Sequence, residues 1–278
     1  MAEYGKKEAE RILRIAETAA RIMTDSVLRE EEISEKAGRG NFVTKYDVAV
    51  QEYLIEALSK AFPEALFFAE EKKDNTLTDA PTFIIDPIDG TANFVFDLHH
   101  SAISIALCIE KKTVIGMVMN PYLDETFYAV LGEGAFLRHA GRDKRLSVRN
   151  IPLSEALVVV GTDPYRKSET GSVTSALLSH ALREGIDVRR FGAASLDLAY
   201  IAAGRATLFA ELFLSPWDYA AGMLLVTEAG GCISTIGGAS LPYAPCSVLA
   251  GAPRAYESFL KEVLPKIPEL TEYLKDRK

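Results

Sequence analysis

The sequence predicts a layered protein of mixed α and β structure, with an α+β first half and an α/β second half. Two amphipathic helical stripes open the chain, short apolar runs of strand length follow them, and strands alternate with helices after about residue 150. The 278 residues are enough for one large domain or two ordinary ones. We expect an N-terminal subdomain at 1–150 and a C-terminal subdomain at 151–278. No low-complexity linker separates them, so a cleft between them is the expected place for a site.

The first half begins with two predicted helices. Apolar residues recur every three or four positions from Ile12 to Val27, which predicts a helix over about 8–28. A second stripe runs from Val50 to Phe62 and ends at Pro63. The Gly-rich, charged segment 34–44 between them is expected to be a mobile loop.

Five apolar runs then predict strands at 66–69, 82–85, 102–109, 114–119 and 126–130. The first two are continuous rather than alternating, so we expect them to be buried on both faces. Glycine-containing segments at 132–136 and 141–146 are expected to be hairpin turns.

The second half alternates between strands and helices. Predicted strands lie at 157–161, 188–190 and 207–212, and predicted helices at 172–183, 194–203, 216–229 and 254–264. Gly204 is in position to cap the second of these helices, and Pro216 to open the third.

The charge balance excludes some partners. There are 39 Asp and Glu residues against 31 Lys and Arg, a net charge of −8, which disfavours nucleic acid and anionic lipid. The charged start and the absence of an apolar run of membrane length predict a cytoplasmic protein without a membrane partner. The three scattered cysteines are expected to be reduced. Common phosphate-loop, dinucleotide and nucleophile motifs are absent from the sequence.

A pair of acids lies where a buried strand is expected to end. Asp86 follows an apolar run, and Asp89 comes three residues later. Sheets of α/β proteins present ligands at strand ends, and Mg²⁺ prefers such oxygen donors. The segment 91–95 is expected to form a short helix that attracts an anion through the N–H groups of Gly90 and Thr91. An acid-rich turn that caps a helix remains the alternative.

Three further acids have two explanations each. Glu70 follows another predicted strand, Asp218 lies in the first turn of a predicted helix, and Asp47 begins another helix after Thr44. Each could serve a metal site. For Asp218 and Asp47, helix capping or compensation of the helix dipole explains the acid equally well.

Two ordered motifs resemble those of a known family. The run DPIDGTANF, from Asp86 to Phe94, resembles the D-P-[IL]-D-G-T-x-N-F motif of the inositol monophosphatase family of Mg²⁺-dependent, Li⁺-sensitive phosphatases. The run WDYAAG, from Trp217 to Gly222, with EAGG at 228–231, resembles the family's second signature. The resemblance implies a layered αβαβα sandwich, a homodimer and a small phosphate-ester substrate.

The resemblance also implies a role for each acid. The metal ligands would be four carboxylates and one backbone carbonyl, from Glu70, Asp86, Asp89, Asp218 and Ile88. They would hold two to three Mg²⁺ ions. Thr91 paired with Asp47 would activate the attacking water, and Glu70, beside a third ion, would complete the catalytic group. The N–H groups of Gly90 and Thr91 would hold the phosphate.

For the alcohol half of the substrate, the resemblance implies Glu211, seven residues before Asp218, as a carboxylate that hydrogen-bonds polyol hydroxyls. The segment 191–197, FGAASLD, resembles a family segment that lines the sugar pocket. The substrate site would then also include residues of that segment and a metal ligand: Gly192, Ala193, Ala194 and Asp218.

Four residues depart from the family pattern: Asn41 replaces Asp, Ala69 replaces Gly, Lys72 replaces Ser and Ala193 replaces an alcohol. Lys72 is expected to bring a cation near the metals. The sequence thus predicts hydrolysis of an inositol monophosphate to inositol and phosphate. The alternatives are fructose-1,6-bisphosphate, a nucleotide 3′-phosphate or histidinol phosphate as substrate, or a regulatory relative that retains the fold.

Overall fold

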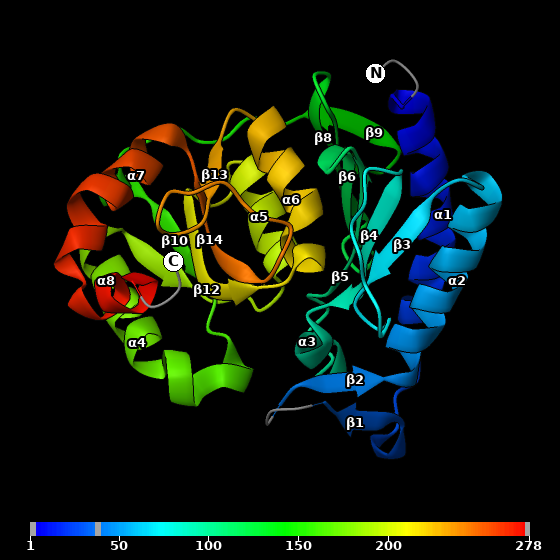
Figure 1. Ribbon diagram of the computed structural model, residues 1–278, viewed down its shortest axis with the longest axis horizontal. Helices are drawn as coiled ribbons and strands as arrows, with labels where there is room; N and C mark the ends of the chain where they lie inside the picture. Colours follow the sequence, from blue (N-terminus) through cyan, green and yellow to red (C-terminus); the bar gives the residue numbers. More distant parts are fainter. Residues whose placement is uncertain (1–3, 37–39, 276–278) are drawn as a thin grey trace.

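The computed structural model describes residues 4–36 and 40–275, and within them seven strands form one sheet and five form another. Figure 1 shows the layers in order from the N-terminal helices to the C-terminal ones. Helices α1 and α2 lie outermost, followed by the larger sheet, helices α5 and α6, the smaller sheet, and helices α4, α7 and α8. The predicted αβαβα sandwich is confirmed.

The larger sheet has the order β3-β4-β5-β6-β7-β8-β9. Its strands are β3 (Leu66–Ala69), β4 (Thr82–Asp89), β5 (Ala102–Ile109), β6 (Lys112–Asn120), β7 (Glu125–Val130), β8 (Gly134–His139) and β9 (Arg142–Arg145). Strands β3 and β4 are parallel, and the remaining neighbours are antiparallel. The five predicted strands are all present, and β8 and β9 occupy the segments where only turns were expected.

Strand β4 is buried along its whole length because helices cover both faces of the sheet. Phe83 and Ile85 belong to the core beneath α1 and α2, whereas Ile84 between them belongs to the core shared with α5 and α6. The same prediction for β3 is wrong. Leu66 is 45% exposed, because β3 is the edge strand and pairs with β4 alone.

Helices α1 (Lys6–Thr24) and α2 (Lys45–Ala61) cover the outer face of this sheet. The predicted extension of α1 to residue 28 is wrong: Val27 is 74% exposed, and its N–H and C=O both hydrogen-bond the Tyr46 hydroxyl instead. Thr44 caps α2 by accepting from the N–H of Tyr46 at 3.1 Å. The cap places the start of the helix at Lys45, two residues before Asp47.

Strands β1 (Ile33–Glu35) and β2 (Phe42–Thr44) form an antiparallel hairpin where a mobile loop was expected. Residues 37–39 of that segment lie outside the described residues. The expected helix at 91–95 is present as α3 (Thr91–Val95). A 3-10 turn, η1 (Glu30–Glu32), precedes the hairpin.

The smaller sheet has the order β11-β10-β12-β14-β13. Its strands are β10 (Leu157–Val160), β11 (Asp187–Arg189), β12 (Leu208–Leu214), β13 (Cys232–Ser234) and β14 (Cys246–Gly251). Strand β10 runs parallel to β11 and β12, and β14 runs antiparallel to β12 and β13. Strands β13 and β14 were not predicted from the sequence.

The outer helices of this side are α4 (Lys167–Glu184), α7 (Pro253–Ser258) and α8 (Pro268–Lys275), with 3-10 turns η2 (Leu153–Glu155), η3 (Pro164–Arg166) and η5 (Leu264–Lys266). The continuous helix predicted at 254–264 is wrong. It changes after α7 into a π-helical turn, η4 (Phe259–Val263). Pro265 follows directly in η5, and a proline cannot donate to an α-helical ladder.

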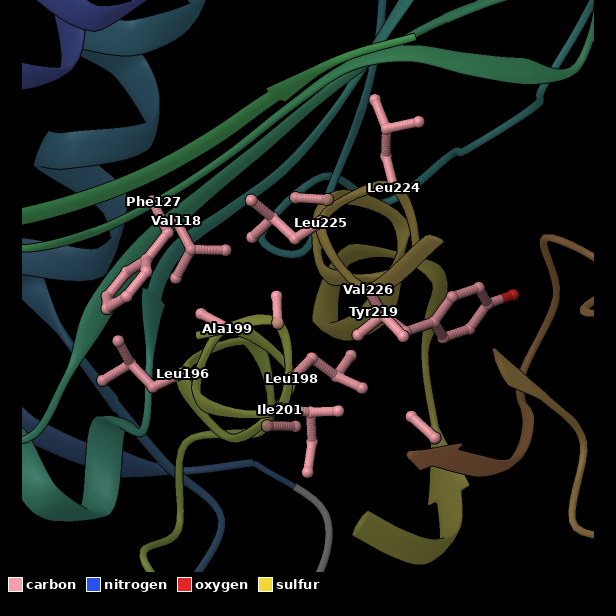
Figure 2. Packing of buried hydrophobic residues seen from close by; sticks show 14 of the residues in the cluster. Val118, Phe127, Leu196, Leu198, Ala199, Ile201, Tyr219, Leu224, Leu225 and Val226 are labelled. Atoms are coloured by element: carbon pink, nitrogen blue, oxygen red, sulfur yellow. The ribbon is translucent and has the colours of Figure 1, made fainter. Parts of the chain in front are cut away.

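The central layer consists of α5 (Ala194–Ala202) and α6 (Pro216–Glu228). Every residue of α5 is buried, as expected for a helix covered on both sides. Figure 2 shows Leu196, Leu198 and Ile201 around α5, with Val118 and Phe127 of the larger sheet beside them. Helices α5 and α6 belong to the second half of the chain, but they share a hydrophobic core with the sheet of the first half. The division into two subdomains at residue 150 stays a prediction.

Small residues let this layer approach its neighbours. A Cβ on Gly116 of β6 would lie 2.6 Å from the carbonyl oxygen of Ala221 in α6. A Cβ on Gly222 would lie 2.5 Å from the Cβ of Leu198 in α5. A larger residue at either position would force α6 away from the sheet or from α5. The start of α6, which carries Asp218, therefore has a fixed position against the end of β4.

No helix within residues 4–36 and 40–275 has the length and apolar character needed to cross a membrane.

Candidate metal and phosphate site

A cavity of about 340 Å³ lies where the ends of β4 and β12 meet the starts of α3 and α6. Both halves of the chain line it. The first half contributes the predicted metal ligands of β4 and the turn into α3, and the second half contributes Glu211, Asp218 and the Gly192 turn. Most of the predicted site residues thus come together at one place.

Three carboxylates form the centre of this cavity. One oxygen each of Asp86, Asp89 and Asp218 lies within 4.8 Å of the others. A β-bulge between Asp86 and Asp89 breaks the register of β4 against β5, and it turns both acids into the cavity. Asp218 also accepts from the N–H of Ser215 at 2.6 Å. Helix capping and a place in the acid cluster, which were alternatives for Asp218, therefore occur together.

The electrostatics of the three acids are unfavourable without a cation. Burial and the negative charges of Glu70 and Asp89 raise the pKa of Asp86 well above its usual range. Burial and the charge of Asp89 do the same to the pKa of Asp218. Burial raises the pKa of Asp89 to about 6, although hydrogen bonds from Ser195 oppose the rise.

Glu70 lies at the end of β3, on the side of the cavity nearest the β1–β2 hairpin. Its carboxylate accepts a hydrogen bond from Lys36 Nζ at 2.9 Å, and the same ammonium also contacts Glu71. Lys36 therefore joins the hairpin to the acid cluster. Glu70 contributes a fourth carboxylate next to the three central ones.

The predicted Thr91–Asp47 pair is present. The Thr91 hydroxyl lies 3.2 Å from Asp47 Oδ1 and 3.1 Å from the carbonyl oxygen of Ile88. Asp47 is fully buried, and its Oδ2 accepts from the N–H and the hydroxyl of Thr44. Burial raises the pKa of Asp47 to about 6, against the opposing effect of those two hydrogen bonds.

The turn at Gly90 requires glycine for two reasons. Its φ is +81°, and a Cβ would lie 3.0 Å from Ala193 Cβ and 3.2 Å from the His100 carbonyl oxygen. Ala193 therefore packs behind Gly90 and, unlike Gly192 and Ala194, does not line the cavity. The sequence prediction placed the backbone of all three in the substrate site, and the side chain of Ala193 lies behind Gly90.

The opposite end of the cavity contains Glu211. Its Oε1 accepts from the N–H of Asp163 at 3.3 Å, and its carboxyl group packs against Gly161, where a Cβ would lie 2.0 Å away. Burial raises the pKa of Glu211 to about 8, while the Asp163 N–H and the positive charge of Arg190 oppose the rise. The acid is thus held at one fixed position.

Several residues of the cavity were not predicted from the sequence. Asp163, Tyr165, Arg190 and Asp197 also line this end. Asp197 lay inside the motif-like segment 191–197, so the segment itself gave a signal for it. Tyr165 lies in the turn η3, and Arg190 follows β11 directly, and no motif in the sequence marked either residue for this site.

Two departures from the family pattern can be placed. Lys72 donates from Nζ to the carbonyl oxygen of Phe67 at 2.8 Å and does not line the cavity. The expectation that it brings a cation near the acids is wrong, because this backbone contact holds it outside. Asn41 does line the cavity, whereas Ala69 is buried in the sheet with its N–H bonded to Asn75.

The donor set fits a hard divalent cation. Carboxylate oxygens within 4.8 Å of one another, raised in pKa by burial and mutual repulsion, are stabilised when a cation neutralises them. The residues that could hold such ions are Asp86, Asp89 and Asp218, with Glu70 and the Ile88 carbonyl beside them. The fold and this cavity together define a class of layered αβαβα proteins with a buried acid cluster that could hold divalent cations.

Comparison with known proteins agrees with that class. The model of the inositol monophosphatase family matches residues 7–269. The chain is 41% identical over 211 residues to inositol-1-monophosphatase of Caulobacter vibrioides, covering 74% of this chain and 80% of the relative. It is 36% identical over 230 residues to Nus factor SuhB of Salmonella typhimurium, covering 82% and 84%.

Solved structures give the same result. The chain superimposes on the inositol monophosphatase (IMPase) of Thermotoga maritima with a TM-score of 0.83, at 27% identity over 99% of this chain and all (100%) of that one. It matches the extragenic suppressor protein suhB of Bartonella henselae with a TM-score of 0.82, at 33% identity over 92% and 98%. The chain belongs to the inositol monophosphatase family.

Proposed function

We propose that this protein is a Mg²⁺-dependent phosphomonoesterase that hydrolyses inositol monophosphate to inositol and phosphate. The main support is the arrangement of three buried carboxylates, with oxygens within 4.8 Å, in the same cavity as Glu211. Acids of this kind can hold the metal that binds a phosphate, and Glu211 can hydrogen-bond the hydroxyls of the alcohol.

Each part of the chain then has a chemical task. Two to three Mg²⁺ ions, when bound, would supply positive charge to the phosphate and to the leaving oxygen. The Thr91 hydroxyl orients the attacking water, and Asp47, 3.2 Å away, accepts the proton through it. The N–H groups of Gly90 and Thr91 point a partial positive charge at the phosphoryl oxygens. No covalent phosphoenzyme is required.

The charge at the alcohol end favours a monophosphate. Asp163, Glu211 and Asp197 line that end together with Arg190, and Arg166 lies 4.0 Å from Asp163. A second phosphate group placed here would be repelled by those of the three carboxyl groups that are ionised. Fructose-1,6-bisphosphate and adenosine 3′,5′-bisphosphate are therefore weaker candidates than a neutral polyol monophosphate, while histidinol phosphate, with a cationic amine, stays an alternative.

A regulatory role is the second candidate, because relatives at 36% identity are named Nus factor SuhB. The acidic net charge of −8 disfavours direct binding to RNA, and a complete set of carboxylates argues for retained catalysis. The proposal further includes a cytoplasmic homodimer that is sensitive to Li⁺, all by family membership.

A phosphate-release panel tests the proposal. It compares inositol-1-phosphate, fructose-1,6-bisphosphate, adenosine 3′,5′-bisphosphate, histidinol phosphate and p-nitrophenyl phosphate, with and without Mg²⁺ and Li⁺. We expect Mg²⁺-dependent release, with the highest kcat/KM for inositol-1-phosphate. No release from any ester at millimolar Mg²⁺ would refute the enzyme and leave the regulatory candidate.

Glu211→Ala completes this test. The variant should lose about 10- to 100-fold in kcat/KM for inositol-1-phosphate, because the buried hydroxyl groups of the alcohol lose their partner. It should lose little for p-nitrophenyl phosphate. Glu155→Ala, in an exposed stretch outside the cavity, is the control. An equal loss on both esters would show that Glu211 does not read the alcohol.

A further inference from the structure

Tyr165 is an aromatic residue of the cavity to which the proposed mechanism gives no task. It lies in η3, between β10 and α4, and lines the cavity together with Glu211. Its side chain is 41% exposed, so it stands at the open side rather than in the core. Within residues 4–36 and 40–275, no group hydrogen-bonds its hydroxyl.

Acids that line the cavity influence the ionisation of this phenol. Burial raises the pKa of Tyr165 to about 12, and negative charge adds to the rise. The charges come from the metal side and from the alcohol side: Glu70, Asp218, Asp89 and Glu211. Tyr165 lines the same cavity as these four acids, and its phenol stays protonated at physiological pH.

The loop that carries Tyr165 is attached to β12 at both ends. At its start, Asp163 adopts a left-handed backbone conformation with φ 39° and ψ 67°, and its N–H donates to Glu211. At its end, the Arg166 guanidinium lies 4.1 Å from the centroid of the Phe213 ring. Glu211 and Phe213 are two residues apart on β12 and both line the cavity, so these two contacts position the loop of Tyr165 relative to Glu211.

The strained conformation at Asp163 points to a specific purpose. A left-handed backbone at a non-glycine residue costs about 1 kcal/mol or more and persists when surrounding contacts hold it. Here the contact is the hydrogen bond to the very carboxyl group that is proposed to bind the alcohol. Pro164 then restricts φ at the next residue and directs the chain into η3.

We propose that Tyr165 is a specificity-determining residue. Its hydroxyl hydrogen-bonds a hydroxyl group of the leaving alcohol, the same alcohol that Glu211 binds. This inference rests on the proposed phosphomonoesterase function. The loop places the phenol over the alcohol end, and the Asp163 N–H keeps it in position relative to the Glu211 carboxyl group. A polyol then has two protein partners, whereas an aryl alcohol without further hydroxyls has neither.

The variant Tyr165→Phe tests this with minimal change, because it removes one oxygen and keeps the ring. We expect KM for inositol-1-phosphate to rise about 3- to 10-fold, as for the loss of one neutral hydrogen bond, with kcat changed less than about twofold. KM for p-nitrophenyl phosphate should not change. Tyr53→Phe removes a phenol oxygen on α2, outside the cavity, and should change neither substrate.

The double variant Tyr165→Phe/Glu211→Ala tests whether the two residues bind the same alcohol together. If both groups hold the same alcohol, Tyr165→Phe should cost less in the Glu211→Ala background than in the wild type. Additive losses would contradict the coupling, and equal effects of Tyr165→Phe on both esters would contradict an alcohol contact. Either result would overturn the inference while the wild-type protein still hydrolyses esters, whereas an inactive wild type would refute the proposed function itself.

Discussion

Ser195 of α5 donates two hydrogen bonds to a single oxygen of Asp89, one from its N–H at 2.7 Å and one from its hydroxyl. Asp89 ends β4 of the first sheet, so the contact crosses between the two halves of the chain. It fixes the orientation of the carboxylate, and both of these bonds go to Oδ2. The neighbouring Asp86 and Asp218 then face the same point.

Ser195→Ala should therefore weaken Mg²⁺ binding without removing a ligand. Outer partners of metal ligands typically contribute 10- to 100-fold to affinity, and the remaining N–H bond places the expected loss near 10-fold. The Mg²⁺ concentration for half-maximal activity measures it. Ser247→Ala is the control, since Ser247 is a buried serine that accepts from the Ile236 N–H, away from the cavity. An unchanged Mg²⁺ requirement would mean that Ser195 only stabilises the fold.

Asp89→Asn should change activity and metal-free stability in opposite directions. Losing one charged ligand removes several kcal/mol of transition-state stabilisation, so turnover should fall at least about 100-fold. In EDTA at pH 8, the variant should unfold at a higher temperature than the wild type, because one of three mutually repelling charges is gone. Added Mg²⁺ should raise the Tm of the wild type more than that of the variant.

The control for that experiment is Asp79→Asn, which removes an exposed acid 3.8 Å from Lys111. It should have the Tm and the Mg²⁺ response of the wild type. A lower metal-free Tm for Asp89→Asn would contradict the proposed repulsion among the three carboxylates. Complementation of a deletion phenotype by the inactive variant would favour the regulatory candidate.

Thr91 and Asp47 should act as one unit in the proton transfer. Thr91→Ser keeps the hydroxyl and should retain most activity, whereas Thr91→Val keeps the shape and should lose about 100-fold or more in kcat. Since the pKa of Asp47 is raised to about 6, it accepts a proton only above that pH. The acid limb of kcat/KM should therefore lie near pH 6, and Thr91→Val should flatten it. If the acid limb of kcat/KM is equally steep in Thr91→Val, a titrating group other than Asp47 causes it.

The sequence could predict those parts of the site that depend on neighbouring residues in the chain, and not those that depend on contacts between distant residues. Asp86 and Asp89 are visible because a buried strand and a turn place them locally, and Glu70 follows another strand in the same way. Ser195 is different. Its task depends on a contact between residues 106 positions apart, which no local pattern reports.

The fold shows the same limit. Strands β3, β5, β6 and β7 and helices α5 and α6 were predicted nearly at their final bounds, because strong apolar patterns define them. Strand β4 was predicted only over 82–85 and continues to Asp89, because its second half is not apolar. The exposure of Leu66 was missed because its sequence resembles that of β4, and only the sheet order makes β3 an edge. Strand β14 was missed because its sequence is mixed in hydropathy, and pairing with β12 and β13 determines it.

Glu211→Gln should make the metal-free protein less sensitive to high pH. The pKa of Glu211 is about 8 in the folded chain against 4.5 in a free side chain. The folded state thus binds the extra proton, so ionisation of Glu211 lowers stability progressively from about pH 4.5 and the full penalty is reached above about pH 8. Gln carries no charge and can still accept from the Asp163 N–H.

After discounting for the open cavity, we expect the Glu211→Gln variant to be roughly 2–4 kcal/mol more stable than the wild type at pH 9, and equally stable near pH 4.5. Urea unfolding in EDTA at both pH values measures the difference, with exposed Glu155→Gln as the control. A difference that is the same at both pH values would trace the effect to packing rather than to the buried charge.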